Sequence, residues 1–151
     1  MSEQPAKTPM RMAEMMILRI GAKVLIPYIL LFALYVQFHG DFGPGGGFQA
    51  GVIMAAGLIL YALIYGLETM HEAWPPWVAE WGMAFGVLLY GGTGVLNMAL
   101  GGNFLEYGTL DPHDPAHGQH YGIILVELGV GICVTCTMLT LYTLFAERGR
   151  R

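Results

Sequence analysis

Charged residues are scarce in this 151-residue chain, and basic residues are absent from most of its length. Only 12% of the residues are charged, against about 25% in soluble domains, whereas 55% are hydrophobic. All seven lysines and arginines lie near the two ends, which argues against nucleic-acid binding. A chain of this size cannot bury so much apolar surface in one aqueous core, so we expect its solvent to be lipid.

The sequence also lacks the residue sets of a stand-alone enzyme. It contains no Ser-His-Asp arrangement, no paired catalytic carboxylates and no cofactor fingerprint, and we expect no bound cofactor. The only two cysteines, Cys133 and Cys136, fall inside an apolar run. Thiols at this spacing in a membrane helix are usually small packing residues, so we do not interpret them as a redox pair.

Three histidines close together raise the question of a metal site. Their offsets of four and three would place them on one helix face, suitable for zinc: His113, His117 and His120. Pro112, Pro115 and Gly118 argue against a regular helix over these residues. We therefore expect a solvated or interfacial loop here, and no metal site.

Four apolar runs are each close to the roughly 20 residues that a membrane-spanning helix needs. They cover residues 17–38, 48–67, 78–100 and 121–145. Trp74, Trp77 and Trp81 surround the start of the third run and are typical of an aromatic belt at the membrane interface. The sequence therefore predicts an all-α, polytopic membrane protein with four transmembrane helices.

The placement of the basic residues predicts the orientation. Because lysine and arginine favour the cytoplasmic side, both termini are expected in the cytoplasm. The loops at 39–47 and 101–120 would then face outward and the loop at 68–77 inward. We expect a cytoplasmic N-terminal segment, a single four-helix membrane domain and a basic cytoplasmic tail, at residues 1–14, 15–146 and 147–151.

A glycine-rich stretch, Gly-Pro-Gly-Gly-Gly-Phe at residues 43–48, separates the first two runs. Glycine permits positive φ and close approach, and proline fixes one φ and removes a donor. A tight turn needs only one or two such residues, so we expect a shaped backbone surface at the start of the second helix. It is not a nucleotide-binding loop, because no Gly-Lys-Ser/Thr follows.

Small residues also recur at a spacing of four within two of the runs. Gly47, Gly51 and Ala55 would line one side of the second helix, and Gly82 and Gly86 one side of the third. Such rows let helix backbones approach closely in a bilayer. The pattern fits packing within this chain and packing against other chains equally well.

Glu127 is the sharpest candidate for chemistry. It lies six residues past Tyr121 in the fourth run, about 9 Å into the membrane at 1.5 Å per residue. Ionisable residues at such a depth usually face protein or water and often mark ion or proton routes. Gly131 shares the face of Glu127 and leaves room for a neighbouring helix. An equally good interpretation is that the Glu127 carboxyl group is structural and is hydrogen-bonded among the helices.

Lys23 and Asp41 are two further candidates for an ion path. Lys23 shares a face with Arg19, and both side chains are expected to reach the headgroups by snorkelling. Because Lys23 enters from the side opposite to Glu127, we expect no direct pairing between these two residues. Asp41 belongs to an outer side that is rich in acidic residues and could concentrate cations.

These features resemble the B subunit of the Mrp (also called Mnh) multisubunit cation/proton antiporters. The matching motif consists of Pro44, Gly45, Gly46, Gly47, Phe48 and Gly51. A second likeness is the stretch 120–130, in which Glu127 opens a small apolar segment. Family members often carry histidine three positions before the proline, where this chain has Asp41. This chain therefore has no imidazole at this position.

The resemblance implies a small, non-enzymatic subunit of a complex that exchanges Na⁺ for H⁺ in the bacterial cytoplasmic membrane. It implies neighbouring A and C subunits, with D, E, F and G subunits in the same complex. In this family the glycine-rich turn would shape subunit interfaces. A membrane-arm subunit of a hydrogenase-type redox complex and a purely structural scaffold are the alternatives.

Overall fold

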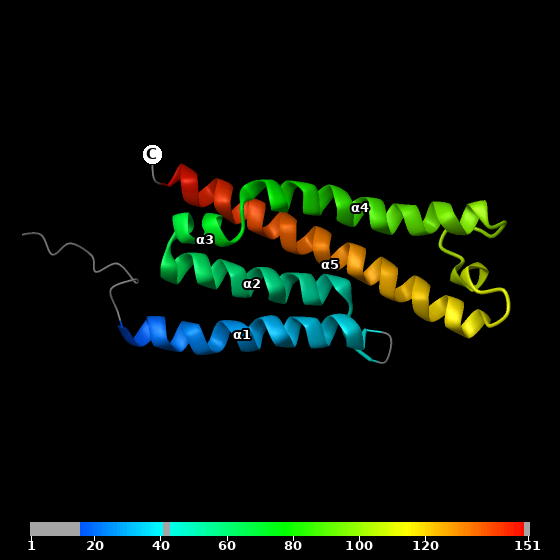
Figure 1. Ribbon diagram of the computed structural model, residues 1–151, viewed down its shortest axis with the longest axis horizontal. Coiled ribbons are helices and arrows are strands. Elements are labelled where there is room, and N and C mark those ends of the chain that lie inside the picture. The colour runs from blue at the N-terminus through cyan, green and yellow to red at the C-terminus, as the bar shows by residue number, and fades with distance from the viewer. Residues whose placement is uncertain (1–15, 41–42, 150–151) are drawn as a thin grey trace, which may run out of the picture.

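The computed structural model describes residues 16–40 and 43–149 (Figure 1). The predicted N-terminal segment 1–14, Asp41 and the last two residues of the basic tail lie outside the described residues. Within the described part, the elements in chain order are α1 (Met16–His39), α2 (Gly47–Tyr65), α3 (Leu67–Ala73), α4 (Pro76–Ala99), the 3₁₀ helix η2 (Tyr107–Leu110) and α5 (Pro115–Arg148).

Four of these helices, α1, α2, α4 and α5, are long and apolar enough to cross a membrane. This confirms the predicted all-α fold with four spans. The second span ends at Tyr65 because Gly66 has a φ of +99°, after which the short α3 begins. The chain is therefore a multi-pass membrane protein in which a short extra helix connects the second span to the third.

The expectation of an irregular loop holds for residues 113 and 114 and is wrong for residues 115–120. Helix α5 begins at Pro115, six residues before the predicted start of the span. Proline at the first helical position loses no helical hydrogen bond, because that N–H has no partner within the helix. The Asp114 carboxylate caps the helix by accepting hydrogen bonds from the backbone N–H groups of Ala116 (3.0 Å) and His117 (3.5 Å).

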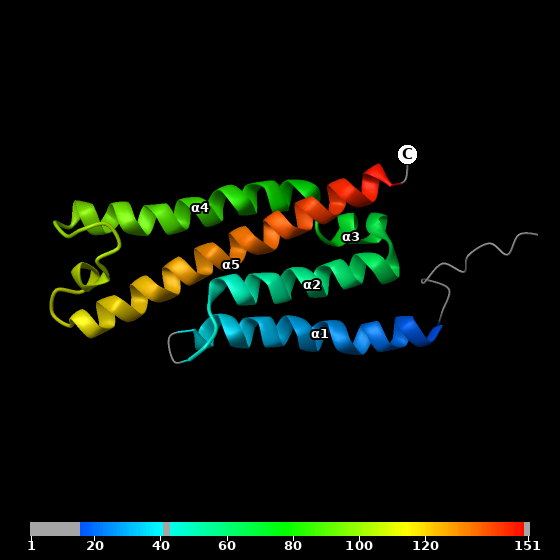
Figure 2. The same cartoon turned by 180° about the vertical axis from the view of Figure 1, so that it is seen from behind.

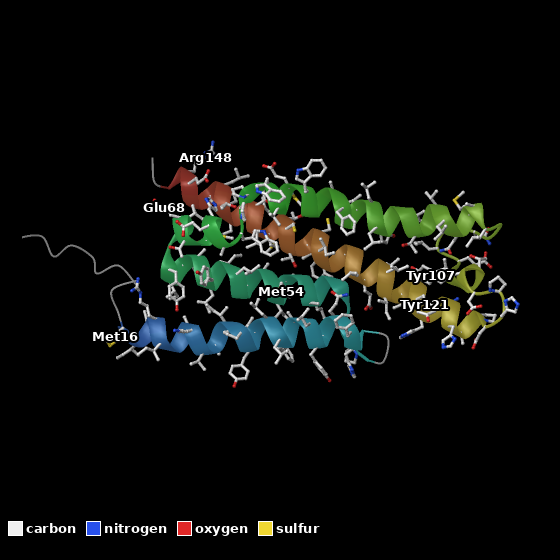
Figure 3. All side chains as sticks on the ribbon, viewed as in Figure 1. Met16, Met54, Glu68, Tyr107, Tyr121 and Arg148 are labelled. Atoms are coloured by element: carbon white, nitrogen blue, oxygen red, sulfur yellow. The ribbon has the colours of Figure 1, made fainter. Side chains whose placement is uncertain are left out.

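The long helices form a layer in the order α1, α2, α5, α4, as both views of the ribbon show (Figures 1 and 2). Helix α1 packs chiefly on α2, α2 packs on α5, and α4 packs on α5. Side chains project from the layer along its whole length, with Tyr107 and Tyr121 near one end and Glu68 and Arg148 near the other (Figure 3). Many large apolar side chains are consequently exposed to the surroundings of this chain.

Helix α5 holds the layer together through small residues. A Cβ built on Gly51 would lie 2.8 Å from the Gly131 carbonyl oxygen, and one on Gly86 would lie 2.6 Å from the Gly129 carbonyl oxygen. The Thr135 hydroxyl lies within hydrogen-bond distance of the carbonyl oxygens of Gly131 (2.7 Å) and Gly51 (3.2 Å). Both predicted rows of small residues thus pack against α5 within this chain.

Candidate functional site

The glycine-rich turn and Glu127 lie against each other. A Cβ built on Gly46 would lie 2.9 Å from Oε1 of Glu127. A Cβ built on Gly40, at the end of α1, would lie 2.5 Å from Oε2 and closer still to Oε1. A Cβ on Gly47 would meet the Glu127 backbone, 2.7 Å from its carbonyl carbon. Three glycines therefore surround one half-buried glutamate, and each leaves space that a larger residue would fill.

The backbone at Gly46 explains why this part of the turn needs glycine. Gly46 has a φ of +116° and immediately precedes α2. Residues with a side chain rarely adopt this backbone conformation. The position also faces the Glu127 carboxyl group. The N-terminus of a helix attracts negative charge, so the start of the 19-residue α2 is an electrostatically favourable place for a carboxylate.

The remaining motif residues point in two directions. Gly45 lies against α1, where an added Cβ would be 3.2 Å from the Val36 carbonyl oxygen. Gly51 is buried against α5. Pro44 and Phe48, in contrast, are exposed, and Phe48 retains 63% of its accessible surface. The glycines of the motif thus serve contacts within the chain, whereas its two bulky members are available to the surroundings.

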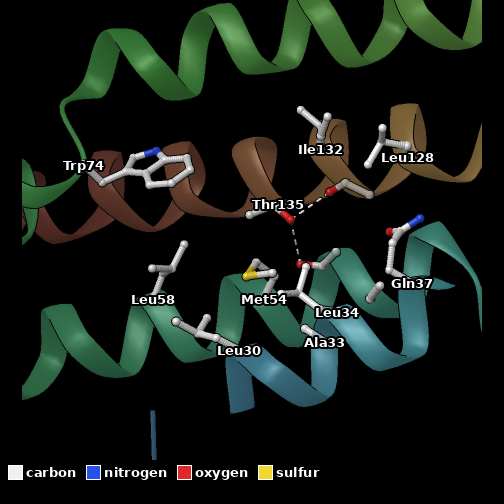
Figure 4. Close-up of a pocket in the computed structure, with 13 residues that line it drawn as sticks. Leu30, Ala33, Leu34, Gln37, Met54, Leu58, Trp74, Leu128, Ile132 and Thr135 are labelled. Carbon is white, nitrogen blue, oxygen red and sulfur yellow. Dashed lines mark hydrogen bonds between the residues drawn. The ribbon is translucent and has the colours of Figure 1, made fainter. Parts of the chain in front are cut away.

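An apolar groove of about 340 Å³ lies beside this site, between α1, α2 and α5 (Figure 4). Each of these three helices contributes at least one small residue to the lining. The groove is lined by Leu30, Ala33, Leu34, Gln37, Ala50, Gly51, Met54, Leu58, Trp74, Leu128, Gly131, Ile132 and Thr135. None of these side chains is charged, so the groove by itself offers an ion no charged group.

Gln37 places its side-chain amide against Gly131 of α5. A Cβ on Gly131 would collide with the Gln37 side-chain oxygen and would lie 3.3 Å from the Gly47 carbonyl oxygen. Gly131 is one helical turn along α5 from Glu127 and lies on the same face. The carboxyl group, the Gln37 amide and the first turn of α2 therefore occupy one region of the layer.

The other ionisable candidates do not join this region. Lys23 is exposed near the start of α1, about 24 Å from His39 along the helix at 1.5 Å per residue. Asp41 lies outside the described residues. His113 and His117 are exposed, and His117 Nδ1 lies 3.6 Å from Asp114 Oδ2. Among the described residues, no three His, Cys, Asp or Glu side chains converge as metal ligands.

Sequence reasoning missed Gly40, Gln37 and the contact between Glu127 and the turn. One signal was present: Glu127 and Gly131 share a face of α5, and Gly47 and Gly51 share a face of α2. Gly131 and the glycines of α2 let the two backbones approach, so residues at the same spacing of four can pack in register. Matching them would have placed Glu127 beside Gly47.

The connection between α4 and α5 is tied down by a separate polar contact. Asn97 is completely buried, and its Oδ1 accepts a hydrogen bond of 3.2 Å from the Thr109 hydroxyl. Tyr107 in η2 packs over Gly122 of α5. Burial raises the pKa of Tyr107 above its ordinary value, and the neighbouring Tyr90 adds to the effect. These contacts hold the connection against the ends of both helices.

Comparison with known proteins identifies the family. Residues 17–140 match a family model described as a domain related to the MnhB subunit of Na⁺/H⁺ antiporters. A Staphylococcus haemolyticus protein named as a putative mnhB2 antiporter component is 29% identical over 127 residues, covering 83% of this chain and 89% of the relative.

Two further relatives agree. A Staphylococcus aureus protein of the same name is 32% identical over 126 residues, covering 82% of this chain and 89% of the relative. A Bacillus subtilis protein, named as the B component of a Na⁺/H⁺ antiporter, is 35% identical over 95 residues, covering 61% of this chain and 64% of the relative. The resemblance stated from the glycine-rich motif is confirmed, and the chain belongs to the family of domains related to the MnhB component of Na⁺/H⁺ antiporters.

Proposed function

We propose that this chain is the B-type component of a multisubunit Na⁺/H⁺ antiporter complex in a bacterial cytoplasmic membrane, and that Glu127 lies on or beside its cation route. The family match along the membrane-spanning body supports the first part. The observation that carries the second part is the Glu127 carboxyl group, which is held at the glycine-rich turn beside the N-terminus of α2.

The layered fold supports a route that is shared between subunits. The described helices leave many large apolar side chains exposed, and the groove beside Glu127 has no charged lining. Glu127 is a half-buried carboxylate on one of the two central helices, and neighbouring chains would supply the further polar groups of a cation route. We propose the A and C subunits as the adjacent chains, with D, E, F and G in the same complex.

The turn has a second role in this proposal. Pro44 and Phe48 are exposed, whereas the glycines between them are packed within the chain. The internal contacts would fix the shape of the turn, and the two exposed residues would present it to a neighbouring subunit. This arrangement supports an interface function for the motif. The names of the relatives favour an antiporter over a hydrogenase-type complex.

Substitution of Glu127 by glutamine in the assembled complex tests the transport role. The change keeps the size of the side chain and removes its charge. Loss of a charge-assisted contact of about 1.5–3 kcal/mol predicts a reduction of Na⁺-dependent proton exchange by roughly tenfold or more in inverted membrane vesicles. Glu80→Gln, which removes an exposed carboxylate from α4, is the matched control and should leave exchange unchanged. If a fully assembled Glu127→Gln complex exchanged Na⁺ for H⁺ at the wild-type rate, the transport role of Glu127 would be wrong. A purely structural scaffold would then be the better interpretation of this chain.

A further inference from the structure

Gly40 lies next to the Glu127 carboxyl group but belongs to no recognised motif. The three heavy atoms nearest to a Cβ built on Gly40 all belong to this carboxyl group, and the two farthest of them would be 2.5 Å (Oε2) and 2.7 Å (Cδ) away. Real Cβ atoms essentially never approach other heavy atoms closer than 3.0 Å. The space that Gly40 leaves empty is therefore the space in which the carboxyl group lies.

The backbone gives no separate reason for glycine at this position. Among the described residues, positive φ values occur at Gly46, Gly66, Gly101 and Leu105, and Gly40 is not one of them. An alanine at position 40 could adopt the same backbone conformation. The contact with Glu127 is what distinguishes Gly40 from an ordinary residue at the end of a helix.

We propose that Gly40 is a positioning residue for Glu127: its missing side chain determines where the carboxyl group lies relative to the N-terminus of α2. This inference rests on the proposed transport role of Glu127. It assigns a function to a residue outside the Pro-Gly-Gly-Gly-Phe element, on the other side of the turn.

The contacts predict that Gly40→Ala moves the carboxyl group without separating the helices. The atoms that an added methyl group would meet are the far end of a flexible side chain, which can rotate away. At Gly47 the added methyl group would instead meet the Glu127 backbone, so that α2 and α5 would have to part. To reach an ordinary contact of about 3.4 Å, the carboxyl group must shift by roughly 1 Å.

A shift of this size is large for a site that depends on preorganisation. Misplacement of a functional group by ~1 Å can reduce activity by as much as ~100-fold. We expect the Gly40→Ala complex to assemble normally and to exchange Na⁺ for H⁺ about tenfold more slowly or worse. Gly21→Ala is the matched control, because Gly21 also lies on α1 and a Cβ there would meet nothing within 4 Å.

The decisive test combines Gly40→Ala with Glu127→Asp. Aspartate is one methylene group shorter, so its carboxyl group is withdrawn from the position that the alanine methyl group would take. The double variant should exchange faster than Gly40→Ala alone, whereas two independent structural defects would add. Wild-type exchange by Gly40→Ala, failure of that variant to assemble, or simple additivity would each overturn the proposal.

A second readout separates this proposal from the transport role. The labelling rate of Glu127 by dicyclohexylcarbodiimide, measured by the mass of the modified peptide, reports the surroundings of the carboxyl group without any transport. We expect Gly40→Ala to change this rate and Gly21→Ala to leave it unchanged, with Glu127→Gln as the unlabelled control. If Glu127→Gln retains exchange, the transport role fails, yet the labelling rate still decides whether Gly40 positions the carboxyl group. An unchanged labelling rate in Gly40→Ala would contradict the positioning role.

Discussion

Replacing Gly86 by alanine should weaken the attachment of α4 to the rest of the chain. A Cβ on Gly86 would lie 2.6 Å from the Gly129 carbonyl oxygen and 2.7 Å from the Cys133 backbone nitrogen. Both are backbone atoms of α5, so they cannot rotate away. The two helices would have to separate by roughly 0.7 Å, which forfeits a quarter to a half of the dispersion energy of each contact along the seam.

The expected cost is about 1–3 kcal/mol, as for other insertions of a methyl group into a well-packed contact. The effect should be clear because, among the described elements, α4 packs chiefly on α5 and only slightly on η2. Unfolding of the full chain by sodium dodecyl sulfate in mixed micelles, followed by tryptophan fluorescence, measures it. Trp77 and Trp81 at the start of α4 would report its release.

Gly92→Ala provides the control for this prediction. Gly92 also lies in α4, is exposed, and has nothing within 4 Å of an added Cβ. The control should therefore unfold at the wild-type detergent concentration, and Gly86→Ala at a lower one. Equal midpoints for the two variants would refute the close backbone contact between α4 and α5.

Three further predictions concern the turn and the connection between α4 and α5. Pro44→Ala changes an exposed residue of the turn and should reduce the amount of assembled complex on native gels more than the exchange rate per complex. Normal assembly with lost exchange would contradict the interface role of Pro44. Because the pKa of the half-buried Tyr107 is raised from 10.0, its contribution to stability is complete below pH 10 and falls as the pH rises further. Proteolysis within residues 100–114 should accordingly accelerate above pH 10, and less so in Tyr107→Phe. The predicted outward orientation requires that His113→Cys reacts with a membrane-impermeant maleimide in intact cells, and failure to react would overturn it.

The membrane spans could be predicted from the sequence because lipid imposes a simple requirement of length and apolarity. The start of α5 was predicted wrongly, because two prolines and a glycine indicated a loop. In the structure Asp114 caps the helix, and one of these prolines occupies its first position. The layered arrangement of the helices could not be predicted either. In a bilayer both buried and lipid-facing positions are apolar, so the hydrophobic pattern does not reveal which helices are neighbours.

The site was predictable in its parts and not in its assembly. Glu127 and the glycine-rich turn each stood out, the first as an ionisable residue in an apolar run and the second by composition. Their contact depends on the relative position of α2 and α5 along their lengths, which is set by backbone contacts such as that of Gly51 with Gly131. Gly40 gave no signal, because a glycine at the end of a helix is common for reasons of capping alone.

Native mass analysis of the mildly extracted, tagged protein, with identification of every co-purified chain, tests the central claim most directly. The proposal that this chain is an antiporter component predicts large antiporter-like subunits in the complex, without iron–sulfur or hydrogenase chains. Co-purified metal-cluster subunits would assign the chain to a redox-driven complex, and a homo-oligomer alone would contradict both assignments.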